Sequence, residues 1–165
     1  MFQLKSISKE GISVALEKAE RYRLLNEPWL AESICFDILE VEPNNTKAIV
    51  TLLLAITDQF STASLANVNQ ARQLLYRLPD EYMRHYYGGI ISEREGKSDL
   101  NRGTSEGGYI AYDRLRDAMD HYEKAEAVRP TGNDDSILRW NTCARLIMHY
   151  HLEPRNEVFV EPPLE

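Results

Sequence analysis

The chain has 165 residues, of which 43% are hydrophobic and 27% are charged, a composition typical of one soluble globular domain with a hydrophobic core. The formal net charge of −7 argues against a nucleic-acid-binding protein, whose contact surface should be basic. The N-terminus lacks the apolar segment of a signal peptide, and no apolar run approaches the roughly 20 residues of a membrane span. We therefore expect a cytoplasmic protein that binds no membrane.

The first third of the sequence predicts three helices. Apolar residues at three- and four-residue steps place a first helix over residues 8–25. Asn26 can cap a second helix, which has Pro28 in its first turn and ends at Pro43. An asparagine pair then turns the chain and caps a third helix. Its sequence, AIVTLLLAI, is apolar on nearly every side, as expected of a buried central helix.

Two further helices are predicted in the middle of the chain. An apolar stripe resumes at Ala71 after a polar stretch, and a proline ends it. Asp80 can cap a fifth helix that runs through Ile90. This helix contains Gly88 and Gly89, and each glycine costs about 1 kcal/mol relative to alanine. We expect a close approach of two helices to offset that cost.

The last third of the chain contains the predicted loop and tail. Residues 96–108, GKSDLNRGTSEGG, lack a helical period and are predicted to form a loop. A sixth helix follows from about Tyr109 to Val128, and residues 131–135 cap a seventh. Residues 154–165 contain three prolines and are expected to form an extended tail, leaving residues 1–153 as a single domain.

An internal repeat links two of these helices. Residues 31–43 read AESICFDILEVEP and residues 118–130 read AMDHYEKAEAVRP. Both segments begin with alanine, carry apolar residues four, seven and ten positions later, and end with proline. A helical stripe that recurs with the same stop signal indicates a repeat architecture.

This pattern resembles the tetratricopeptide repeat (TPR) family, whose unit is a helical hairpin of about 34 residues. In a first unit, Ala19, Tyr22, Ala31 and Pro43 match the family's small, aromatic, alanine and proline positions. A second unit is degenerate, and a third matches around the 118–130 segment with a longer connection. The resemblance covers roughly residues 12–150. It implies an all-α fold, an α-α superhelix of about three hairpins and a capping helix, with about seven helices.

The resemblance also implies a function. In such arrays the first helices of successive hairpins line a concave groove that holds a peptide or helix of a partner. We therefore expect a non-catalytic protein-interaction module, monomeric or homodimeric, with no cofactor, metal or catalytic residue. Leu16 and Glu20 occupy positions where the chaperone-binding subtype of the family has its clamp residues, which disfavours that subtype. The predicted groove residues are Arg23, Lys47, Leu54, Tyr82, His85 and, depending on the register of the last helix, Arg139 or Arg145.

Two alternatives from other classes remain open. One is a small-molecule- or metal-dependent enzyme that uses His85, His121 and polar residues of the last helix. The other is a structural homo-oligomer in which the C-terminal VFV segment occupies a groove of another copy. The GKS sequence at Gly96 lacks the preceding glycine and strand of a phosphate-binding loop. His149 and His151 do not share a helix face, so we expect no metal there.

The seventh helix carries three further expectations. Asp135 and Arg139 are four residues apart and can pair on the helix surface. Trp140 could belong to the core or anchor a partner in the groove, and we favour the core because a capping helix must cover the last hairpin. Cys35 and Cys143 lie among apolar helical residues, so both should be buried and reduced, since two thiols form neither a disulfide framework nor a zinc site.

Overall fold

The structure, a computed structural model, describes residues 1–61 and 65–156. In these residues the chain forms seven α-helices, two short 3-10 turns and no strand, so the predicted all-α fold is confirmed. The predicted superhelical twist stays a prediction. The helices are α1 (Ile12–Leu24), α2 (Pro28–Val41), α3 (Thr46–Thr57), α4 (Leu65–Leu74), α5 (Glu81–Arg102), α6 (Gly107–Ala127) and α7 (Asp135–His149).

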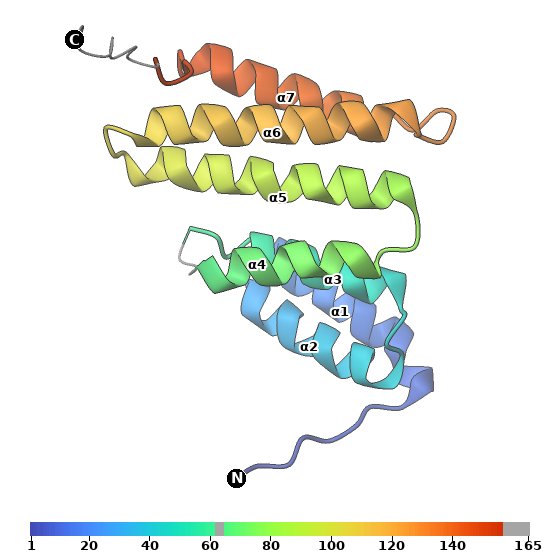
Figure 1. Ribbon diagram of the computed structural model, residues 1–165. Coiled ribbons are helices and arrows are strands. Elements are labelled where there is room, and N and C mark those ends of the chain that lie inside the picture. Colours follow the sequence, from blue (N-terminus) through green and yellow to red (C-terminus); the bar gives the residue numbers. More distant parts are fainter. Residues whose placement is uncertain (62–64, 157–165) are drawn as a thin grey trace, which may run out of the picture.

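Helices that follow one another in the chain lie side by side (Figure 1). The α1–α2, α2–α3, α5–α6 and α6–α7 pairs are the most extensive contacts in the described part, and the α5–α6 pair exceeds the others. Helices α2 and α7 lie at opposite ends of this array (Figure 1). Each helix therefore buries its apolar stripe mainly against its sequence neighbours, as in repeat proteins.

Local capping signals account for several helix boundaries. The Asn45 side chain accepts a hydrogen bond from the backbone N–H of Ala48 at 3.0 Å. Asp80 accepts one from the backbone N–H of Met83 at 2.8 Å. Both predicted caps are thus confirmed. The prediction that Asn26 caps α2 is wrong, because this residue has a φ of 60° and turns the chain after α1. The residue directly before α2 is Glu27, and its side chain forms no capping hydrogen bond.

The predicted loop at residues 96–108 is mostly helix. Helix α5 continues to Arg102 and stops at Gly103, whose φ of 63° is the left-handed conformation common after helix ends. Gly96 lies against α6, where an added β-carbon would be 3.3 Å from the backbone oxygen of Ala111. The Ser98 hydroxyl donates to the Phe60 carbonyl at 3.1 Å. Packing against α6 therefore overrides the weak helical propensity of this segment.

The two adjacent glycines of α5 allow the close helix approach that the sequence predicted. A β-carbon on Gly89 would lie 2.5 Å from the Tyr122 ring, and one on Gly88 would lie 3.1 Å from the His121 ring. Side chains of α6 therefore occupy the space that a β-carbon at Gly88 or Gly89 would need. This contact explains why the glycine pair is compatible with the middle of a helix.

The buried side chains form two clusters that meet at α5. The first cluster comes mainly from α1 to α4 and includes Ile91, whereas the second comes from α5 to α7 and includes Ile90. Leu54 and Tyr87 pack against both clusters. Cys35 and Cys143 are buried and free, as predicted, and burial raises the pKa of each thiol to about 12.

The predicted tail is described only as far as Asn156. Arg155 forms an ion pair of 3.0 Å with Glu106 at the start of α6. The VFV segment at residues 158–160 lies outside the described residues, and its docking in a groove stays a prediction. Among the described helices, none has both the length and the hydropathy needed to cross a bilayer.

Candidate functional site

Helices α1, α3, α5 and α7 place polar side chains on one side of the array, which we call the odd-helix face. It comprises a small pocket and two ion networks. The pocket has a volume of about 190 Å³, and its walls come from α1, α3 and α5. It is lined by Glu20, Thr46, Lys47, Val50, Thr51, Met83 and Tyr87.

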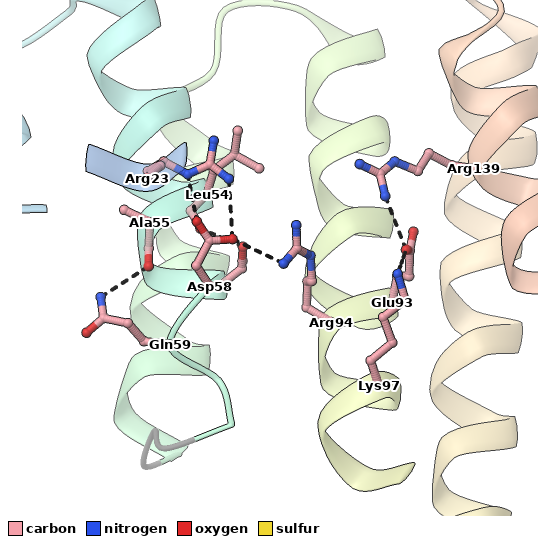
Figure 2. A network of polar contacts seen from close by, with 10 residues as sticks. Arg23, Leu54, Ala55, Asp58, Gln59, Glu93, Arg94, Lys97 and Arg139 are labelled. Atoms are coloured by element: carbon pink, nitrogen blue, oxygen red, sulfur yellow. Dashed lines mark hydrogen bonds and ion pairs between the residues drawn. The ribbon is translucent and has the colours of Figure 1, made fainter. Parts of the chain in front are cut away.

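The first ion network joins α1, α3 and α5 through one carboxylate. Asp58, at the end of α3, accepts from Arg23 Nε at 2.7 Å and from Arg23 Nη2 at 3.3 Å. Arg94 Nη1 of α5 donates to the same carboxylate at 3.1 Å. Figure 2 shows the two guanidinium groups on either side of Asp58. Because all three side chains are half-buried, this bridge helps to fix α5 relative to the first two hairpins.

The second ion network is centred on Glu93, whose side chain is fully buried. The carboxylate accepts from the Tyr122 hydroxyl at 2.7 Å, from Arg139 Nη1 at 3.2 Å and from the Lys97 ammonium group. Burial alone would raise the pKa of Glu93, but Lys97, Tyr122 and Arg139 outweigh it and hold that pKa below its ordinary value. The charged form of Glu93 therefore links α5 to α6 through Tyr122 and to α7 through Arg139. Figure 2 shows the contacts with Lys97 and Arg139.

The odd-helix face is locally positive although the chain is acidic. Arg23, Arg94, Lys97 and Arg139 share the two carboxylates, so the networks carry a formal charge of +2 in a chain of net charge −7. The buried Nε of Arg94 has no hydrogen-bond partner among the described residues. The face thus combines two networks of net positive formal charge with a pocket that has apolar walls.

The structure brings together some of the predicted groove residues. Arg23 and Arg139 belong to the ion networks, and Lys47 lines the pocket. Leu54 is half-buried and packs between the two core clusters. Arg145 is exposed on α7 and forms no ion pair among the described residues, so of the two alternatives Arg139 joins the face.

Two predicted groove residues lie elsewhere. Tyr82 stacks on Tyr86 at a centroid distance of 5.7 Å and borders a separate pocket with Val128. His85 points toward α6, where its ring centroid lies 6.4 Å from that of His121. The prediction that His85 faces the groove is therefore wrong, because its position on α5 directs it to the opposite side from Arg94.

The last helix also differs from expectation. Arg139 pairs with the buried Glu93 instead of Asp135, because a carboxylate removed from water needs its cations more than an exposed one does. Trp140 is half-buried: it packs against the second core cluster, and its indole N–H donates to Glu123 at 2.9 Å. The tryptophan is thus an edge of the core with a polar contact at the surface.

Sequence reasoning missed the two carboxylates that organise this face. Asp58 and Arg94 are 36 residues apart, and no local pattern connects them. Glu93 and Lys97 have the four-residue spacing of a helical ion pair, which was a usable signal. This spacing did not lead to a predicted ion pair, because Lys97 falls in residues 96–108, which were predicted to form a loop.

The enzyme alternative, with His85 and His121, stays a prediction. His85 and His121 are neighbours, but no group of three or more His, Cys, Asp or Glu side chains suited to a metal ion occurs in residues 1–61 and 65–156. The raised pKa of both buried thiols makes them poor nucleophiles. Comparison of the chain with family models, curated proteins and solved structures gave no match.

Proposed function

We propose that this protein is a non-catalytic interaction module whose odd-helix face binds a segment of a partner protein. The observation that carries the proposal is the arrangement of that face: three helices from successive hairpins line one pocket, and a band of formal charge +2 lies on the same helices. A TPR-like array would use this side for the same purpose.

The chemistry of the face favours a partner segment that combines apolar and acidic side chains. Val50, Met83 and Tyr87 provide apolar contact area in the pocket. The surplus positive charge beside them attracts carboxylates and orients the segment. Because Arg23 and Arg94 are already paired with Asp58, the added attraction should be modest and sensitive to salt.

A site-specific cross-linking experiment tests this proposal. A photoreactive amino acid at Val50 should capture a partner in the native host, whereas the same group at the exposed Tyr76, outside this face, should not. Lys47→Glu should weaken binding of the captured partner about five- to tenfold through charge reversal at the pocket. Lys18→Glu, an equal charge reversal at an exposed position outside the pocket, is the control. Equal capture at both positions, or equal loss in both variants, contradicts the proposal.

A further inference from the structure

A second pocket lies on the other side of α5, away from the odd-helix face. Its volume is about 410 Å³, within the range of about 300–1,000 Å³ typical of small-molecule sites. Helices α4, α5 and α6 all contribute to its walls. It is lined by Arg72, Ser92, Arg114, Asp117, Asp120, His121 and Lys124.

Two polar side chains of this pocket, those of Ser92 and His121, reach into the contact between the helices. Ser92 is 1% exposed, and its hydroxyl accepts from Arg72 Nη2 at 3.4 Å. The Nδ1 atom of His121 is buried and has no partner among the described residues. Gly88 leaves the space in which the His121 ring lies. Because Nδ1 is enclosed against Gly88, only the remaining edge of the His121 ring, which helps to line the pocket, is available to a ligand there.

The cations of the pocket are incompletely neutralised by direct ion pairs. Arg72 and Arg114 converge on one carboxylate, that of Glu95, and the Arg114 contact is 3.7 Å long. Lys124 forms no ion pair among the described residues and is exposed. Asp117 and Asp120 are the acidic groups of the lining, but both are exposed to water, and neither pairs with these cations in the described part. Water therefore screens the two aspartates more than the half-buried guanidinium groups.

The electrostatic environment of His121 is also positive on balance. Burial lowers its pKa first, and Lys124 of α6, Arg72 of α4 and His85 of α5 lower that pKa further. Asp117 of α6 acts in the opposite direction and does not compensate. Three cationic or titratable groups on three helices thus oppose protonation of one imidazole. A bound anion would instead favour the protonated form of His121 and raise its pKa.

We propose that the pocket between α4, α5 and α6 binds a compact oxyanion of the phosphate class, either free or as the monoester of a small molecule. Planar guanidinium groups bind phosphate oxygens with two parallel hydrogen bonds, and Arg72 and Arg114 approach the pocket from opposite helices. Protonated His121 donates to the anion, so binding of the anion and uptake of a proton favour each other. The volume leaves room for the organic part of an ester.

A titration of the histidine ring signals by NMR tests the site on the full chain. Inorganic phosphate is added at constant ionic strength, with sodium chloride as the reference salt, and His121→Gln assigns the signal. Phosphate should shift the His121 signal saturably and raise the midpoint of its titration by about one pH unit. O-phosphoserine, tested in parallel, distinguishes a preference for the monoester from a preference for the free ion. An absent or unsaturable shift with both probes overturns the proposal.

Variants then locate the site. Lys124→Gln changes an exposed side chain, so it should fold normally and weaken phosphate binding at least about fivefold. Arg72→Gln should have a larger effect, with circular dichroism confirming that the variant is folded. Arg129→Gln removes a cation that pairs with Asp134 at the start of α7, outside the pocket, and should leave the affinity unchanged. Unchanged affinity in Lys124→Gln, or equal loss in Arg129→Gln, overturns the assignment to this pocket.

Discussion

At the scale of single residues, the unusual feature of this protein is a fully buried carboxylate that keeps its charge. Glu93 is surrounded by an ammonium group, a guanidinium group and a phenol, which together replace the water that it loses. Such an arrangement is costly to break from one side, because the half-buried Lys97 and Arg139 lose their counter-charge and the buried Tyr122 hydroxyl loses its acceptor. The Glu93 network therefore specifies how α5, α6 and α7 fit together.

Replacing this carboxylate should be strongly destabilising. Glu93→Gln keeps the shape of the side chain but leaves Lys97 and Arg139 without an anion, so the free energy of unfolding should fall by about 3–5 kcal/mol. Tyr122→Phe removes one hydrogen bond to the charged group and should cost about 1.5–3 kcal/mol. Urea denaturation measures both values. The exposed Glu126→Gln is the control and should change stability by less than about 0.5 kcal/mol.

The same carboxylate should make stability depend on pH in a defined direction. The pKa of Glu93 in the folded protein lies below its ordinary value of 4.5. Its charged form therefore stabilises the fold fully above that value, and the contribution is lost as the pH falls through the folded-state pKa. The difference in unfolding free energy between the natural chain and Glu93→Gln should stay constant from about pH 7 to 5 and shrink below. A difference that already shrinks above pH 5 would mean that burial dominates and raises this pKa.

At the scale of helices, the features set by local signals could be predicted from the sequence, and those set by long-range packing could not. The hairpins could be predicted because helix periodicity and caps such as Asn45 and Asp80 are encoded by neighbouring residues. The continuation of α5 through Gly96 could not, since it depends on the backbone of α6 at Ala111. The odd-helix face was predicted in part, because the position of Arg23 follows from the repeat, whereas its carboxylate partner follows only from the packing of distant helices.

Two glycine substitutions should separate helix packing from helix propensity. Gly89→Ala gains intrinsic helix propensity but forces a methyl group against the Tyr122 ring, so it should destabilise the protein by about 1–3 kcal/mol. Gly108→Ala meets nothing closer than Leu152 at 3.8 Å and should be neutral or stabilising by up to about 1 kcal/mol. The melting temperature should therefore fall in Gly89→Ala and stay unchanged or rise in Gly108→Ala. Equal shifts would contradict the tight α5–α6 contact.

At the scale of the whole molecule, α5 joins two sets of helices that each have their own buried cluster. Ile91 belongs to the cluster of the first four helices, and Ile90 to that of the last three. The contact of α5 with α4 is much smaller than its contact with α6. The Asp58 network therefore spans the weakest junction of the array (Figures 1 and 2). We infer that this polar bridge couples the two halves during unfolding.

This coupling can be measured with one tryptophan. In Trp29→Phe the remaining Trp140 reports on the second cluster, while far-UV circular dichroism reports on all helices. The two denaturation curves should coincide in this background, because shared apolar contacts and the Asp58 bridge make unfolding cooperative. Adding Asp58→Ala leaves Arg23 and Arg94 unpaired at the junction, so the first four helices should unfold at lower denaturant and the curves should separate.

Curves that already differ before the Asp58 substitution would mean that the halves unfold independently. Curves that still coincide after it would assign the coupling to Ile91, Leu54 and Tyr87 alone.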